Sequence, residues 1–225
     1  MKDIKVVLID ADDTLLDFSE TAKKSLKEGE ETFNLTLPDN TLEVFFETNT
    51  ALWQALERGE LTFEKLHEIR WGLIFEKLGV DFDGQKFESV FWKRLREIAV
   101  MMRGADDLLE YLSKKYTICV ASNAPVGQQE SKLTEIGLFP FISQFFVSGD
   151  IGYAKPKAEF FDECMRRLGV EKHQVIMIGD SLTADIIGAK EYGIKTCWFN
   201  HRREKEEKGV ADFIVYELSE IKKFL

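Results

Sequence analysis

The chain has 225 residues, 44% of them hydrophobic, and a formal net charge of −10 with a pI near 5.0. This length can bury a full core, either as one large domain or as a core with a smaller insertion. The acidic balance argues against nucleic acid polymers or acidic membranes as partners, because both require clustered lysine and arginine. A small phosphorylated metabolite stays compatible, since a few placed cations and a metal would attract it.

The first predicted strand covers residues 4–9 and ends at two acids, Asp10 and Asp12. Side chains two residues apart on an extended or sharply turning chain point the same way, so both carboxylates can face one reaction centre. One could attack phosphorus and carry an aspartyl-phosphate, while the other protonates the leaving alcohol and later accepts a proton from water. Such a reaction also needs a metal and a fixed positive side chain nearby.

A long segment without convincing strands follows, over residues 17–102. Its phenylalanine, leucine and tryptophan residues recur at helical spacing, and Pro38, Gly59, Gly79 and Gly84 punctuate it, which predicts about four helices packed as a bundle. We therefore expect a catalytic core formed by residues 1–16 and 103–225, with a helical cap inserted over residues 17–102.

The rest of the chain alternates apolar, β-rich runs with helix-like segments. This alternation predicts an α/β fold with a parallel sheet and helices on both faces. The mixed charges of residues 201–208 predict a solvated loop that contributes no site residues. The predicted strands cover residues 4–9, 116–121, 145–147, 175–178, 195–199 and 213–215.

Cys119, Cys164 and Cys197 are widely spaced and form no Cys-x-x-Cys pair, which is typical of a reducing compartment. The chain begins directly with a strand, without a signal-peptide pattern, and no apolar stretch approaches the length of a membrane span. We therefore expect a cytoplasmic protein with structural thiols.

Two further strand ends offer groups that suit a phosphate. Ser122 and Asn123 follow one strand, before a helix expected to begin near Val126, and a hydroxyl with free backbone N–H groups there could hold phosphate oxygens. A serine at a strand end is more often a turn or cap residue. Lys155 precedes Pro156, which biases its backbone away from helix, and it could be the required fixed cation. A single lysine is otherwise usually a solvated surface charge.

Asp180 closes the apolar strand over residues 175–178, and Asp185 follows one helical turn later. Two hard oxygen donors suit Mg²⁺, which Asp180 could bind directly while Asp185 holds a coordinated water or Lys155. The alternative is a structural role, with Asp180 or Ser181 capping a helix and Asp185 favouring its N-terminus.

Taken together, these strand ends supply an acid pair, a hydroxyl, a lysine and a second acid pair at the edge where open α/β sheets bind ligands. The set resembles the haloacid dehalogenase-like hydrolase superfamily, through residues 10–14, Ser122, the Lys155-Pro156 pair and residues 179–185. The match spans the chain. Asp13 departs from the commonest version of the family's first motif, which has glycine there.

The resemblance implies a Rossmann-like core with an inserted helical cap, Asp10 as nucleophile and Asp12 as general acid and base. Substrate phosphate would be held by Ser122 and Lys155, and Lys155 would also orient Asp10. From its position at the same strand end, Asn123 is predicted to bind substrate beside Ser122. Mg²⁺ would be bound by the Asp10 carboxylate, the Asp12 backbone carbonyl and Asp180, with support from Asp185.

Several activities occur in this superfamily. Dehalogenases lack an acid at the position of Asp12, which argues for phosphate as the substrate group. Phosphonate hydrolases use a cap lysine for a Schiff base, and Lys23, Lys24 and Lys27 leave that reading open. Phosphomutases share the core chemistry, and a catalytically silent binding protein on this scaffold is the alternative outside enzymes.

A closer likeness comes from residues 10–12, 49–53, 152–156 and 196–200, which look like those of bacterial pyrimidine 5′-nucleotidases related to housecleaning enzymes. The prediction is a Mg²⁺-dependent pyrimidine nucleoside 5′-monophosphatase, with a sugar phosphate or phosphoglycolate phosphatase as the alternative. Substrate choice would lie in the cap. Its polar and aromatic candidates, not assigned as site residues because aromatics at helical spacing usually form a bundle core, are Asn49, Trp53, His67, Arg70 and Trp71.

Overall fold

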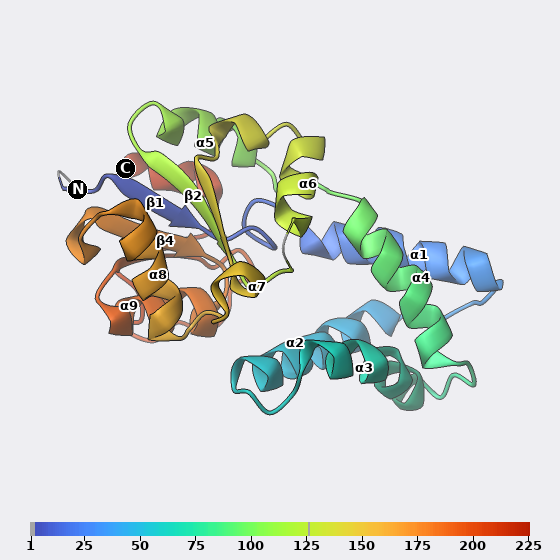
Figure 1. Cartoon of the computed structure of the whole chain (residues 1–225). Helices are drawn as coiled ribbons and strands as arrows, with labels where there is room; N and C mark the ends of the chain where they lie inside the picture. Colours follow the sequence, from blue (N-terminus) through green and yellow to red (C-terminus); the bar gives the residue numbers. More distant parts are fainter. Residues whose placement is uncertain (1–2, 126) are drawn as a thin grey trace. The chain divides into compact units, whose positions relative to one another are not determined.

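The computed structural model describes residues 3–125 and 127–225, and the chain forms two compact units (Figure 1). One unit contains the residues up to Phe18 together with Ala99–Leu225, and the other is Ser19–Ile98. The first unit also includes residues 17–18 and 99–102, which were expected in the cap. Leu16 and Met101 pair there as an antiparallel bridge. The predicted helix start near Val126 lies outside the described residues.

The larger unit is built on a six-stranded parallel sheet with the order β3-β2-β1-β4-β5-β6. This arrangement confirms the predicted α/β fold. Its strands are β1 (Val6–Ile9), β2 (Thr117–Ser122), β3 (Gln144–Val147), β4 (Val175–Gly179), β5 (Lys195–Phe199) and β6 (Phe213–Val215).

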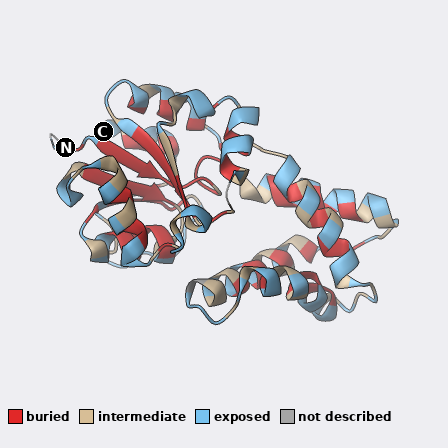
Figure 2. Ribbon diagram, in the orientation of Figure 1, coloured by how far each residue is buried: buried red, intermediate tan, exposed pale blue. Residues whose placement is uncertain are grey.

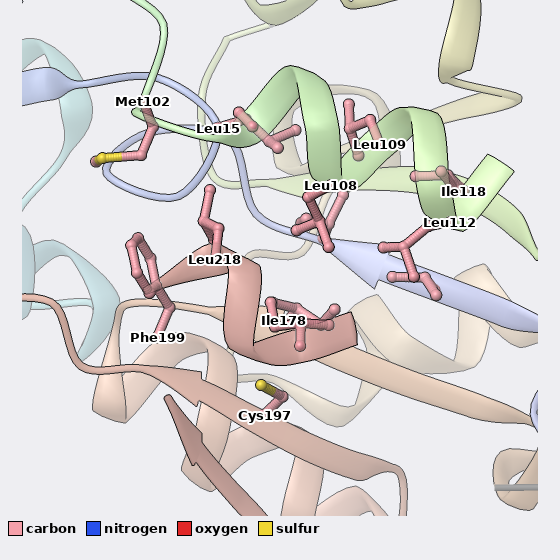
Figure 3. Close-up of a cluster of buried hydrophobic side chains, with 14 of the residues drawn as sticks. Leu15, Met102, Leu108, Leu109, Leu112, Ile118, Ile178, Cys197, Phe199 and Leu218 are labelled. Carbon is pink, nitrogen blue, oxygen red and sulfur yellow. The ribbon is translucent and has the colours of Figure 1, made fainter. Parts of the chain in front are cut away.

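Helices cover both faces of this sheet, which explains why its central strands are continuous hydrophobic runs. Figure 2 shows the strands as buried almost throughout. On one face, Val7 and Ile9 belong to a cluster with α5 (Ala105–Ser113) and the 3₁₀ helix Leu218–Lys223, which Figure 3 shows in close-up. On the other face, Val6 packs in a cluster with α8 (Ala158–Leu168).

Shorter helices complete this unit. Cys119, Cys164 and Cys197 are free and buried. None of the helices in the described part of the chain combines the length and hydrophobicity needed to cross a membrane. The remaining helices are α6 (Gln128–Glu135), α7 (Ser148–Ile151), α9 (Gly188–Tyr192), a π-helical segment (Leu182–Ile187) and 3₁₀ turns at Phe139–Phe141 and Lys172–Gln174.

The strand order reverses at β1, because the chain proceeds from β1 to β2 and β3 on one side and from β4 to β5 and β6 on the other. Open α/β sheets bind ligands at the carboxyl ends of the strands beside such a reversal. Ile9 is in register with Val120 and Ile178, so the residues that follow these three strands emerge at the same edge.

The smaller unit consists of four helices over the described residues, as predicted. Trp71 is fully buried there among Phe45, Phe87 and Phe91. Thr62 caps the third helix by accepting a hydrogen bond from the Lys65 backbone N–H. The helices are α1 (Phe18–Phe33), α2 (Thr41–Glu57), α3 (Phe63–Leu78) and α4 (Gly84–Glu97).

Candidate active site

Lys155 and Asp10 meet at the carboxyl edge of the sheet. Asp10 directly follows β1, and the buried Lys155 Nζ donates a hydrogen bond to its Oδ1 over 2.7 Å. The same ammonium donates to Asp185 Oδ1 over 2.6 Å and to the Ala121 carbonyl over 2.5 Å. Three acceptors around one ammonium fix its position, so the Asp10 carboxylate is held in a single place.

The side chain of Asn123 holds the backbone of Lys155. Its Oδ1 accepts from the Lys155 N–H over 2.8 Å, and its Nδ2 donates to the Lys155 carbonyl over 2.9 Å. Its own carbonyl accepts from Ser148 Oγ over 3.1 Å. Both ends of the side-chain amide therefore bond to Lys155. If Asn123 binds phosphate, it would do so through its backbone N–H.

Three carboxylates gather beside this lysine. One ligand oxygen from each of Asp10, Asp180 and Asp185 lies within 4.8 Å of the others. Thr14 Oγ1 lies 3.5 Å from Asp180 Oδ1, and Trp198 Nε1 donates to the Asp180 carbonyl over 2.8 Å. Each of these acids was predicted to lie at a strand end or one turn beyond it. The parallel register of β1 and β4 brings them together.

The position of Asp185 depends on two small neighbours. A Cβ on Gly179 would lie 2.2 Å from Asp185 Oδ2, so any larger residue at the end of β4 would displace this carboxylate. The Ser181 backbone N–H donates to the same oxygen over 3.1 Å, and Ser181 Oγ accepts from the Ala184 N–H. The two roles considered from the sequence therefore occur together: Ser181 caps the helical segment, and Asp185 lies in the acid cluster.

The acid cluster carries more negative charge than its lysine can balance. Burial raises the pKa of Asp10 to about 8, against the lowering effect of Lys155. Burial also raises the pKa values of Asp180 and Asp185 above their ordinary value. Burial works to lower the pKa of Lys155, but the neighbouring carboxylates raise it. Hard oxygen donors with uncompensated negative charge fit Mg²⁺.

This excess charge predicts that Mg²⁺ binding at neutral pH releases protons. A raised pKa means that ionised Asp10 destabilises the metal-free fold, so its contribution to stability falls as pH rises from about 4 to about 8. Mg²⁺ requires the ionised form and should bind more tightly over that range. Titration calorimetry in buffers of different ionisation enthalpy measures the protons released. Asp10→Asn should release fewer, and pH-independent affinity without proton release would contradict the prediction.

The Asp12 side chain is not part of this three-acid group and contacts α6. Its Oδ2 accepts from Gln129 Nε2 over 2.5 Å, and its Oδ1 lies 3.5 Å from Lys132 Nζ. Ser122 Oγ, at the end of β2, accepts from the same Gln129 amide over 3.2 Å and from the Ala124 N–H over 3.1 Å. The structure thus brings Asp12 and Ser122 together through a glutamine that the sequence reasoning missed.

Asp13 is buried and forms an ion pair with Arg202. Its φ of 60° lies in the left-handed region, which glycine adopts more readily than other residues. Burial raises the pKa of Asp13 to about 6, although Arg202 lowers it. Residues 201–208 were predicted to be a solvated loop, and this is wrong for Arg202, whose partner lies 189 residues away along the chain.

The polar candidates of the helical unit form a buried network instead of an open surface. Arg70 Nη2 donates to Glu88 Oε1 over 2.6 Å, and its Nη1 donates to Asn49 Oδ1 over 2.9 Å. His67 Nδ1 lies 2.7 Å from the same Glu88 oxygen. A buried arginine paired in this way joins α2, α3 and α4.

The chain resembles proteins of one family over most of its length. The family model for haloacid dehalogenase-like hydrolases matches residues 4–193. The HAD-hydrolase YfnB of Bacillus subtilis (strain 168) is 33% identical over 201 residues, which cover 89% of this chain and 86% of that protein. The crystal structure of YfnB bound to magnesium matches with a TM-score of 0.89 at 30% identity, over 98% of this chain and 97% of that chain.

Two relatives have named activities. The pyrimidine 5′-nucleotidase PynA of Streptococcus pneumoniae is 30% identical over 96% of this chain and 93% of its own length. The pyrimidine 5′-nucleotidase YjjG of Escherichia coli (strain K12) is 27% identical over 97% of this chain and 96% of its own length. These similarities extend over both units of the chain.

Proposed function

Because the chain belongs to the haloacid dehalogenase-like hydrolase family, we propose that it is a Mg²⁺-dependent phosphatase that hydrolyses pyrimidine nucleoside 5′-monophosphates. The observation that carries the reaction type is the ion pair of 2.7 Å between Lys155 and Asp10, placed beside two further buried acids. The similarity to PynA and YjjG supports the choice of substrate.

In the first step of the proposed reaction, the Asp10 carboxylate attacks phosphorus. A bond forms from an Asp10 oxygen to phosphorus while the bond from phosphorus to the nucleoside 5′ oxygen breaks. Asp12 gives its proton to that leaving oxygen. Lys155 holds Asp10 in place, and its positive charge, with the Ser122 hydroxyl, would hold the phosphate oxygens.

In the second step, water attacks phosphorus and Asp12 accepts a proton from that water. The bond from phosphorus to the Asp10 oxygen breaks and inorganic phosphate leaves, which restores both aspartates. The residues that would hold Mg²⁺ are the carboxylates of Asp10 and Asp180 with the Asp12 backbone carbonyl, supported by Asp185. When bound, the ion would offset the negative charge that nucleophile and phosphate bring together.

The two carboxylates have separate surroundings, as this division of roles requires. Asp10 lies in the buried acid cluster with Lys155, whereas the Asp12 side chain is 34% exposed and contacts Gln129 and Lys132. A partly open acid suits exchange of protons with a leaving alcohol and with water. Attack on carbon would need no acid at this position, so the arrangement supports phosphate esters.

Substrate choice is tested by phosphate release with Mg²⁺ and with EDTA. The panel contains UMP, dUMP, dTMP, purine monophosphates, sugar phosphates and phosphoglycolate. We expect metal-dependent release with the highest kcat/KM for the pyrimidine nucleotides. Preference for a sugar phosphate or phosphoglycolate would contradict the substrate but keep the reaction type. Absence of turnover on every ester, p-nitrophenyl phosphate included, would favour a silent binding protein.

A further inference from the structure

We infer that Gln129 and Lys132 are positioning residues that hold the carboxylate of Asp12 in its working orientation, an inference that rests on the proposed role of Asp12. Both belong to α6 and are three positions apart, so they lie on one helix face. Each contacts a different oxygen of the carboxylate, Oδ2 for Gln129 and Oδ1 for Lys132. Contacts to both oxygens restrain both torsions of the aspartate side chain.

The burial of Lys132 supports this role. Its side chain is 3% exposed, and burying an ammonium is unfavourable unless a negative charge compensates it. Among the residues that the structure describes, Lys132 forms its ion pair with Asp12, at 3.5 Å. α6 is otherwise a polar helix, so a lysine on its exposed side would have been easily accommodated.

Gln129 gives a second, independent indication. Its side chain is fully buried, and its Nε2 donates to both Asp12 and Ser122, over 2.5 and 3.2 Å. The amide nitrogen faces Asp12 Oδ2, a carboxyl oxygen that can accept this hydrogen bond in either protonation state of Asp12. The amide oxygen is left buried without a hydrogen-bond partner in the described part of the chain. An unpaired buried acceptor is unfavourable for folding, which argues for a functional reason to retain this amide.

The Asp12 side chain is also partly exposed to solvent. With 34% of its side chain exposed, the carboxylate is held from the direction of α6 and remains accessible to a leaving group. In the first step the proton moves from Asp12 to the departing alkoxide as the bond from phosphorus to oxygen breaks and the Asp10 oxygen bonds to phosphorus. This transfer requires an orientation that α6 supplies through Gln129 and Lys132.

Leaving-group dependence tests the inference. An alkoxide needs a proton to depart, whereas p-nitrophenolate departs as a stable anion, so a misplaced acid harms alkyl esters selectively. The kcat/KM values, which report phosphoenzyme formation, are measured for dUMP, or the best alkyl ester found, and for p-nitrophenyl phosphate. The variants are Lys132→Met, Gln129→Leu and Lys132→Arg, with Asp12→Asn as reference and the exposed Lys114→Met as charge-matched control.

General acid catalysis raises the rate by a factor of about 10² to 10⁴. We expect Lys132→Met and Gln129→Leu to lower kcat/KM for the alkyl ester by at least about tenfold. On p-nitrophenyl phosphate the same variants should lose less than about threefold, because that leaving group requires little protonation. Lys132→Arg keeps the cation and should retain most activity. Adding Lys132→Met to Asp12→Asn should cause no further loss, since both act through the same carboxylate.

Other outcomes would overturn the inference. Equal losses on both esters with a raised KM would show that Lys132 binds phosphate instead. A gain in activity would show that the contacts hold Asp12 away from the substrate. If Asp12→Asn shows leaving-group dependence and the α6 variants do not, only the positioning role is overturned. If Asp12→Asn itself shows no leaving-group dependence, the proposed role of Asp12 is overturned. Gln129→Leu tests the same point should Lys132→Met fail to fold, which circular dichroism reveals.

Discussion

Replacing Asp10 with asparagine is expected to abolish phosphate release and phosphoenzyme formation while the fold stays intact. The amide has no charge and is a poor nucleophile, so the first bond to phosphorus does not form, and loss of a nucleophile lowers kcat by about 10⁴-fold or more. Asparagine has nearly the same shape, and its side-chain oxygen can still accept from Lys155 Nζ. The loss should therefore come from chemistry and not from unfolding.

Acid-quenched reactions with ³²P-labelled substrate measure the phosphoenzyme directly. The matched control is Asp39→Asn, which makes the same change at an exposed residue of the helical unit and should leave turnover unaltered. Thermal denaturation of both variants checks the fold. Full activity in Asp10→Asn would rule out this residue as the nucleophile, even if the substrate panel had already identified a good phosphate ester.

Lys155→Met is expected to lower the free energy of unfolding and to remove most activity. The substitution leaves the buried carboxylates of Asp10 and Asp185 without their shared ammonium, and breaking a buried pair in this way costs about 3–5 kcal/mol. It also removes the hydrogen bond that the Ala121 carbonyl accepts. The nucleophile then loses the contact that holds it in position, so turnover falls together with stability.

The pH dependence separates this electrostatic effect from a simple packing defect. Protonated carboxyls have no need of the ammonium, so the stability deficit of Lys155→Met should shrink as pH falls. Urea denaturation in EDTA at several pH values measures it. Lys114→Met removes an exposed ammonium that pairs with Glu110 and should change stability by less than about 0.5 kcal/mol. A deficit that stays constant with pH would contradict the electrostatic explanation.

The sheet was predictable from the sequence because its strands are buried on both faces. Residues 195–199 and 213–215 were predicted as strands and are β5 and β6 with the same bounds. The first strand is shorter than predicted, because Ile4 and Lys5 precede the ladder that begins at Val6. Continuous apolar runs reveal such strands, whereas the ends of a run depend on pairing with neighbours that the sequence alone does not give.

The acid cluster was predictable for a related reason. Asp10 and Asp180 each end an apolar run, and parallel strands bring such ends to one edge of the sheet. Gln129 and Arg202 carried no comparable signal. They contact acids that lie 117 and 189 residues away in the chain, and one belongs to a polar helix, the other to a charged loop. Polarity in such segments predicts solvation, so burial of a single face or side chain becomes visible only in the folded structure.

The bridge between Leu16 and Met101 has a consequence for how the chain folds. β1 and β2 are neighbours in the sheet, yet all of Ser19–Ile98 lies between them in the sequence. Pairing distant segments carries an entropic cost that a shorter connection reduces. Within the helical unit, α1 and α4 approach each other where Gly29 lies against the ring of Phe87. The bridge itself holds the chain together on both sides of the insertion, so β1 and β2 can pair although the helical unit separates them in the sequence.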